Sequence, residues 1–172
     1  ASLINCKQDP EWHPEGDVWT HTLHCMDVFA RERINEEWED LVVGFAVLCH
    51  DLGKPLTTKI GEDGRIRSPL HEPKGEGPTR SFLSRMTNQQ DLQEQVFPLV
   101  RRHLTPRTFY KDKASDGAIR RLANKVKRID RLVRVASADI KGRPPRKDDF
   151  PEGPWLIKRA EELKVNDSEP QP

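Results

Sequence analysis

The sequence predicts an all-α domain of six or seven helices with one small hairpin near residues 57–70. Three observations carry this prediction. Apolar residues recur at helical spacing along most of the 172-residue chain. Fourteen prolines and ten glycines divide this pattern into short elements. The one strand-like stretch, residues 57–70, contains Asp63-Gly64, a dipeptide typical of a hairpin turn.

The elements follow from local patterns. Residues 1–16 contain too much Pro and Gly for a helix at their end, and Asp17 is the expected N-cap of the first helix. Pro98 is expected to kink or divide the helix that contains it. Basic residues at 105–115 and prolines at 142–153 predict two loops. The expected helices span about residues 18–33, 38–50, a segment beginning near 77, 91–104, 116–127, 129–140 and 154–165.

Length and composition predict one domain, residues 1–165, followed by a polar tail, residues 166–172. The chain can bury a core, although only 34% of it is hydrophobic and 33% is charged. No apolar run approaches the ~20 residues of a membrane span, and three cysteines without paired spacing indicate reduced thiols. We therefore expect a cytoplasmic protein without membrane contact. An initial Ala instead of Met indicates an excised domain or a processed chain.

The chemistry of the chain centres on His50-Asp51, an adjacent pair at the end of an apolar helix. Imidazole and carboxylate groups are ligands that divalent metals favour. Gly53 is expected to allow a left-handed exit from the helix, and Pro55 to prevent the helix from resuming. Lys54 places a cation where it could meet a phosphate oxygen. A solvated pair at a helix end is the alternative interpretation.

Six side chains on apolar faces are candidate metal ligands. A carboxylate among inward-facing aliphatic residues is costly unless it is paired or metal-bound, so Asp139 is informative. A buried salt bridge to an arginine is the alternative for Asp139. His21 and His103 could instead be core histidines, His71 could face solvent, and His13 is interpreted as a turn residue. The six candidates are His21, His50, Asp51, His71, His103 and Asp139.

Charge is distributed unevenly, although the net charge is only +1. Residues 101–147 contain sixteen Lys or Arg and four Asp, so the rest of the chain is strongly acidic. This asymmetry indicates an anionic partner such as a nucleotide or RNA. Solvated helix faces are the alternative. The candidate contacts on the basic part are Arg102, Arg107 and Arg143.

The ordered pattern of His21, His50-Asp51 and Asp139 resembles the HD superfamily of metal-dependent phosphohydrolases. HPEGDVWTHT at residues 13–22, LCHDLGKP at 48–55 and the segment 130–145 are similar to the HD domain of bacterial CCA-adding tRNA nucleotidyltransferases. The resemblance covers about residues 10–145. It implies an HD-domain helical bundle around a metal centre, with phosphatase or phosphodiesterase activity on 2′,3′-cyclic and 2′-phosphorylated nucleotides.

The resemblance also implies ligand roles. His71 and His103 match the extra histidines of members that hold two metals, with Asp51 as the bridge. The sequence after His71, residues 72–76, departs from the smooth Gly-Ala helix entry of those members. The implied ion is divalent (Mn, Ni, Mg, Fe or Co), with one or two ions bound. The family's four core positions correspond to His21, His50, Asp51 and Asp139.

We therefore expect a divalent-metal-dependent phosphohydrolase acting on nucleotide or RNA-end phosphoesters such as 2′,3′-cyclic phosphates. His50 and Asp51 are the expected catalytic residues, and Lys54 is expected to assist them and to contact the phosphate. The alternatives are a non-catalytic, metal-stabilised tRNA-binding module of a nucleotidyltransferase and a nucleotidase for free mononucleotides. No Gly-Ser followed by Asp-x-Asp on a strand pattern appears, so we do not expect this chain to add nucleotides by itself.

Overall fold

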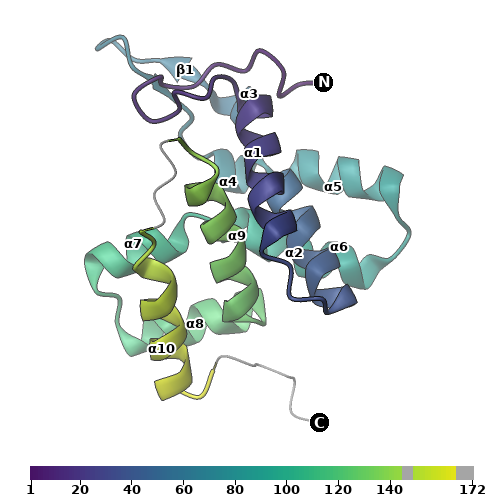
Figure 1. Ribbon diagram of the computed structural model, residues 1–172, viewed down its shortest axis with the longest axis vertical. Coiled ribbons are helices and arrows are strands. Elements are labelled where there is room, and N and C mark those ends of the chain that lie inside the picture. The colour runs from purple at the N-terminus through teal and green to yellow at the C-terminus, as the bar shows by residue number, and fades with distance from the viewer. Residues whose placement is uncertain (145–148, 166–172) are drawn as a thin grey trace.

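Helices dominate the computed structural model, which describes residues 1–144 and 149–165 (Figure 1). This confirms the predicted all-α class. The first half contains α1 (Val18–Arg31), α2 (Glu37–Cys49), α3 (Lys54–Thr57), β1 (Lys59–Ile60), β2 (Ile66–Arg67), α4 (His71–Lys74) and α5 (Glu76–Met86). The second half contains α6 (Gln90–Arg102), α7 (Thr105–Asp112), α8 (Asp116–Val126), α9 (Ile129–Lys141) and α10 (Glu152–Glu162).

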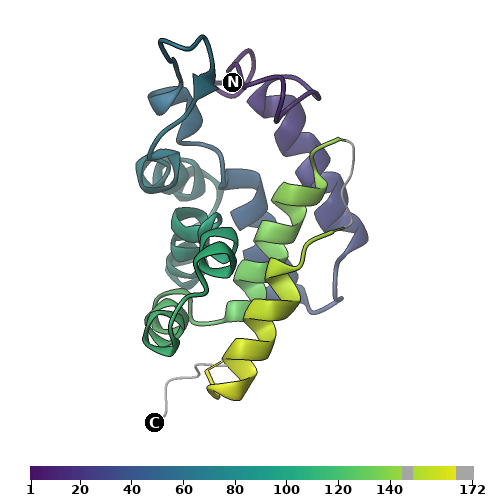
Figure 2. The same cartoon turned by 90° about the vertical axis from the view of Figure 1, so that its left-hand side faces the viewer.

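Helix α9 lies at the centre of the bundle. It packs against α1, α2 and α10, and the two views of the ribbon show α10 along one side of it (Figures 1 and 2). Leu132, Val135 and Ala136 recur at helical spacing on its buried face. Asp139 continues that same face, so packing of α9 carries a carboxylate into the interior.

Local signals at the first helix and the hairpin predict the structure correctly. Asp17 caps α1, because its Oδ1 accepts a hydrogen bond of 2.8 Å from the backbone N–H of Thr20. Strands β1 and β2 pair antiparallel, as predicted for residues 57–70. Gly64 adopts a φ of +75° in the turn between them, a conformation that glycine accepts without steric cost.

The predicted loop at residues 105–115 is wrong, because residues 105–112 form α7. Pro106 is buried near the start of this helix, and Phe109, three residues later, packs against the core. Two apolar residues therefore provide an inward face that the basic composition of the segment conceals. The expected loop at 142–153 gives way to α10 at Glu152, and its residues 145–148 lie outside the described part. The predicted tail, residues 166–172, also lies outside it.

Pro98 does not divide its helix, because α6 runs without interruption from Gln90 to Arg102. Proline lacks the N–H that would bond to the carbonyl of residue 94. Glu94 is exposed, so water can hydrate that carbonyl and reduce the cost of the lost bond. The helix continues to His103, which caps its C-terminal end.

We expect Arg131→Ala to lower the free energy of unfolding by about 3 kcal/mol. Arg131 and Glu39 are both buried, and Arg131 Nε and Nη2 each donate a 2.6 Å hydrogen bond to the Glu39 carboxylate. The substitution leaves that carboxylate buried. The loss falls at the low end for a broken buried pair, because Arg128 Nη1 still lies 3.5 Å from Glu39.

Urea denaturation of purified variants measures this loss. Lys158→Ala is the matched control, because Lys158 makes only an exposed 4.0 Å ion pair with Glu162. Its effect should stay within about 0.5 kcal/mol. Equal stabilities of the Arg131→Ala protein and the unmodified chain would contradict the proposed contribution of the buried pair to the free energy of unfolding.

Candidate metal centre

The predicted ligands come from five parts of the fold. His21 lies on α1 and Asp139 in the last turn of α9. His50 directly follows α2, and Asp51 comes next in the turn before α3. His71 is the first residue of α4, and His103 directly follows α6. Three of the four imidazoles therefore stand at the ends of helices.

His50, His71 and His103 share one local geometry. The Nδ1 of each ring donates a hydrogen bond to the backbone carbonyl three residues earlier, at 2.6, 2.8 and 2.8 Å respectively. A carbonyl oxygen can only accept, so Nδ1 carries the proton in each ring. In the neutral imidazole Nε2 then carries the lone pair, which is the form that binds a metal.

A carboxylate fixes the fourth ring in the same way. Glu15 Oε1 accepts a hydrogen bond of 2.8 Å from His21 Nδ1 and one of 2.9 Å from His13 Nδ1. Burial would raise the pKa of Glu15, but the bonds from His13 and His21 outweigh burial and lower it to about 2. Glu15 is therefore ionised and accepts a hydrogen bond from Nδ1 of His21, so in the neutral ring Nε2 of His21 carries the lone pair. A carboxylate behind a metal-binding histidine is the usual outer-shell arrangement of metal sites.

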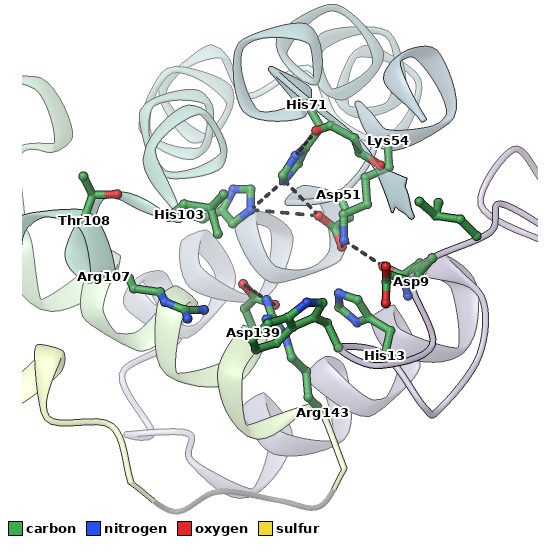
Figure 3. Close-up of a pocket in the computed structure, with 15 residues that line it drawn as sticks. Asp9, His13, Asp51, Lys54, His71, His103, Arg107, Thr108, Asp139 and Arg143 are labelled. Atoms are coloured by element: carbon green, nitrogen blue, oxygen red, sulfur yellow. Dashed lines mark hydrogen bonds and ion pairs between the residues drawn. The ribbon is translucent and has the colours of Figure 1, made fainter. Parts of the chain in front are cut away.

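The two oxygens of Asp51 face two different pairs of imidazoles. Figure 3 shows one of these pairs, His71 and His103, beside Asp51. Oδ2 lies 3.3 Å from His50 Nε2 and 3.8 Å from His21 Nε2. Oδ1 lies 3.4 Å from His71 Nε2 and 3.9 Å from His103 Nε2. Asp51 is only 2% exposed. One buried carboxylate thus stands between two groups of nitrogen ligands.

Asp139 completes the first group. Its Oδ1 lies 3.0 Å from His21 Nε2 and 3.7 Å from His50 Nε2. Arg143 Nη2 donates hydrogen bonds of 2.9 and 3.1 Å to the two oxygens of Asp139. The ion pair with an arginine is therefore present together with the histidine contacts. Burial would raise the pKa of Asp139, but Arg143 and His21 outweigh burial and hold it well below its usual range.

The donor set fits divalent cations. The lone pairs on the Nε2 atoms of His71 and His103 face each other across 3.3 Å, and His50 Nε2 is buried without a well-formed hydrogen bond. A divalent cation among these nitrogens would accept the lone pairs and offset the charge of the neighbouring carboxylates. Three clusters of described residues each place their ligand atoms within 4.8 Å of one another: His21, Cys25, His50 and Asp139; His13, Glu15 and His21; and Asp51, His71 and His103.

The electrostatics of the histidines agree with this fit. Burial opposes a charge on His50, but Asp51 and then Asp139 outweigh burial and raise its pKa to about 10. Burial, reinforced by the charge on His50, lowers the pKa of His103 to about 3, and burial also lowers that of His71. The carboxylates thus attract positive charge to the centre, while two of its rings stay neutral and available as ligands.

Two expectations around the pair, those for Gly53 and Pro55, need correction. Gly53 is not left-handed, because its φ is −80°. Glycine is required there since a Cβ would lie 2.0 Å from the carbonyl oxygen of His71. Pro55 does not stop helix formation, because it lies in the first turn of α3, where proline is tolerated. Lys54 is close to the centre as expected, and its Nζ lies 2.8 Å from Asp51 Oδ2.

The structure separates the three predicted substrate-binding arginines. Arg107 and Arg143 line a pocket of about 360 Å³ that contains Asp51, His71, His103 and Asp139. Arg102 does not line this pocket and instead lies in a hollow with Arg101 and Lys125. Neighbouring residues on a helix point about 100° apart. The orientation that carries His103 inward therefore turns Arg102 away.

The sequence analysis missed the part of the pocket that precedes α1. His13, interpreted as a turn residue, lines the pocket, and Glu15 lies buried behind it. The acidic residue between His13 and His21 was the available signal, because a carboxylate close to two histidines can orient both rings. The remaining members of this wall carry no local pattern. They are Gln8, Asp9 and Trp12.

Comparisons with known proteins agree with this centre. A family model described as "HD domain" matches residues 18–135. The Multifunctional CCA protein of Xylella fastidiosa (strain M12) is 31% identical over 173 residues, which cover 96% of this chain and 39% of that protein. The corresponding protein of Laribacter hongkongensis is 32% identical, covering 86% of this chain and 36% of the relative. The chain thus spans about two fifths of the length of these relatives.

No solved structure gives a significant match to the chain. Within the described residues, no helix combines the length and apolar character that crossing a membrane requires. The family match covers more than half of the sequence and includes five of the six predicted ligands, His21, His50, Asp51, His71 and His103. On this match and this geometry, the chain belongs to the HD domain family.

Proposed function

We propose that this chain is a divalent-metal-dependent phosphohydrolase acting on nucleotide or RNA-end phosphoesters such as 2′,3′-cyclic phosphates. The single observation that carries the proposal is the placement of Asp51 between two pairs of imidazoles. Membership of the HD domain family supports it. A bridging carboxylate between two sets of ligands is typical of sites that hold two ions and hydrolyse phosphoesters.

The proposed ligands divide between two ions. Oδ2 of Asp51 would join His21, His50 and Asp139 at the first ion, and Oδ1 would join His71 and His103 at the second. The ligand set is compatible with Mn, Ni, Mg, Fe or Co, since it consists of imidazole nitrogens and carboxylate oxygens. When bound, such ions polarise a phosphoryl oxygen and lower the pKa of water toward neutrality, which is the chemistry that hydrolysis requires.

Cationic side chains of the same pocket would bind the phosphate. Lys54 Nζ contacts Asp51 Oδ2 at 2.8 Å and donates to Gln8 Oε1 at 2.8 Å. An ammonium group has three N–H donors, so one more can point toward a phosphoryl oxygen. Arg143 is held by Asp139, and Arg107 is exposed at the pocket. Together these groups would orient the phosphoester and offset its charge.

A non-catalytic, metal-stabilised tRNA-binding module of a nucleotidyltransferase is the second candidate. The names of the relatives favour it, because they are Multifunctional CCA proteins of which this chain matches only about two fifths. In that case a chelator would lower the melting temperature of the chain, and no hydrolysis would occur with or without the metal. Binding of tRNA would weaken steeply with added salt as phosphate contacts are lost.

We expect Asp51→Asn to reduce hydrolysis of bis-p-nitrophenyl phosphate and of 2′,3′-cyclic AMP by more than about 100-fold. Losing an outer-shell partner alone typically costs 10- to 100-fold in metal affinity or activity, and Asp51 would contact both ions directly. Steady-state rates of protein stripped of metal and reloaded with Mn²⁺, Ni²⁺ or Mg²⁺ measure the effect.

Asp27→Asn is the matched control, because Asp27 is exposed on α1 and remote from the pocket lining. It should retain the rate of the unmodified chain. Undiminished turnover by the Asp51→Asn protein would exclude this pocket as the site of hydrolysis. A chain without turnover on either substrate, whose melting temperature still falls with chelator, would favour the binding module.

We expect Glu15→Gln to weaken Mn²⁺ binding by about 10- to 100-fold. Glutamine can still accept a hydrogen bond, but it carries no charge to strengthen His21 as a ligand or to fix its tautomer. Isothermal titration with Mn²⁺ measures the affinity, and circular dichroism checks that the helices persist. The control is Glu62→Gln, an exposed change in the hairpin. Equal Mn²⁺ affinities of the Glu15→Gln and control proteins would contradict the outer-shell role.

A further inference from the structure

One wall of the pocket is built from residues that precede the family match. The match begins at residue 18, whereas Gln8, Asp9, Trp12 and His13 all line the pocket. Figure 3 shows Asp9 and His13 across the pocket from Arg107 and Thr108. The metal-binding chemistry lies between these two sides. The wall formed by residues 8–13 is therefore placed to contact a part of the substrate that the metal ligands do not reach.

The start of the chain is fixed to the first helix. The backbone N–H of Val18 donates to the carbonyl of Cys6 at 3.0 Å, and that of Trp19 donates to the carbonyl of Leu3 at 3.2 Å. The side chain of Leu3 is only 5% exposed. These contacts attach the residues before the wall to the N-terminal end of α1, although they form no regular element.

The hairpin holds the wall from the other side. Arg65 Nε donates a 3.2 Å hydrogen bond to Asp9 Oδ2, and the same guanidinium forms an ion pair with Glu11. Gln8 accepts a 2.8 Å hydrogen bond from Lys54, which in turn contacts Asp51. The wall is thus connected to the hairpin and to the metal centre. In both ribbon views the start of the chain and the hairpin lie at the same end of the molecule (Figures 1 and 2).

The side chains of the wall suit a nucleoside. Trp12 presents a large aromatic ring that is 52% exposed at the pocket, and Ile66 adds apolar surface to the same lining. Asp9 adds a carboxylate, which can accept hydrogen bonds from the amino groups of a base or the hydroxyls of a ribose. Aromatic side chains bind bases by stacking without selecting among them. The pocket volume, about 360 Å³, lies in the range of small-ligand sites.

We propose that residues 8–13 are the nucleoside-recognition wall of this site and that Trp12 stacks on the base of the nucleotide whose phosphate reaches the metal centre. The assignment rests on the proposed function for the position of the phosphate. It concerns binding, so it can be tested without turnover. The wall distinguishes a nucleotide from an inorganic phosphate, because only the nucleotide has a ring for Trp12 to contact.

The test compares adenosine 5′-thiophosphate with inorganic thiophosphate, two probes that resist hydrolysis. Isothermal titration is performed on the Mn²⁺-loaded full chain. Trp12→Ala should weaken binding of the nucleoside thiophosphate by about 5- to 150-fold, the range expected for one stacked base. Binding of inorganic thiophosphate should not change. Trp12→Phe should recover most of the lost affinity, because it restores an aromatic face.

Trp38→Ala is the control. Trp38 is 37% exposed on α2, donates to Gln95 and does not line the pocket, so its loss should alter neither affinity. Arg65→Ala, which releases Asp9 and Glu11, should weaken binding of the nucleoside probe and leave inorganic thiophosphate unaffected. That selectivity separates loss of the wall from general unfolding.

Two results would overturn the proposal. One is a Trp12→Ala protein that binds adenosine 5′-thiophosphate as tightly as the unmodified chain does. The other is an unmodified chain that binds the nucleoside probe no more tightly than inorganic thiophosphate. Failure of the proposed function has a different outcome, namely selective nucleotide binding through Trp12 with no hydrolysis of any phosphoester. That result would support the role of residues 8–13 in nucleoside recognition and would contradict the proposed hydrolase activity.

Discussion

Two buried carboxylates surrounded by imidazole nitrogens are the constraint on which the rest of the fold depends. Asp51 and Asp139 are 2% and 3% exposed, and an uncompensated charge at that depth costs several kcal/mol. Lys54 and Arg143 provide part of the compensation through contacts of 2.8 and 2.9 Å. Asp51 and Asp139 raise the pKa of His50, so this ring carries a proton when no cation is bound, whereas burial keeps His71 and His103 neutral. A bound cation would supply the rest of the positive charge. The helices of the bundle therefore surround a buried acidic site that attracts cations.

The backbone at the ends of two helices orients the imidazoles of this site. His50 and His103 follow their helices directly, where backbone carbonyls have no partner within the helix. Each ring satisfies one such carbonyl through Nδ1 and is thereby fixed in the tautomer that presents Nε2 to the centre. Gly53 completes the arrangement, since only a residue without Cβ lets the turn after Asp51 approach the backbone of His71. Capping and ligand orientation are thus the same interaction.

The sequence was sufficient to predict the all-α class and to select six side chains that lie together in the structure, because both have local signals. Periodic apolar residues mark the helices, and polar residues on apolar faces, such as Asp139, are conspicuous. The prediction failed where the structure depends on the direction in which a side chain points, or on a contact between residues that are distant in the sequence. Arg102 and His103 are neighbours, and only the packing of α6 determines which of them points inward. Helix α7 was missed because the basic composition of residues 105–115 conceals the two apolar residues that pack the helix against the core.

The wall before α1 could not be predicted for a different reason. Its contacts join residues about fifty positions apart, such as Gln8 with Lys54 and Asp9 with Arg65. No periodicity or spacing within residues 1–17 encodes such a partner, and that segment lies outside the family match. The pairing depends on where the hairpin places Arg65 after the helices have assembled.

The division of the pocket between residues inside and outside the matched span, 18–135, has a physical consequence. Residues 18–135 provide His21, the His50-Asp51 pair, His71 and His103, which would supply the reactive chemistry common to any phosphoester. The flanking segments add the wall at residues 8–13 and, with Arg143, a cation beside Asp139. Arg143 cannot be changed without exposing the charge of Asp139, whereas Trp12 contacts none of the buried carboxylates. A substitution of Trp12 can therefore alter substrate binding while the cation-binding centre stays intact.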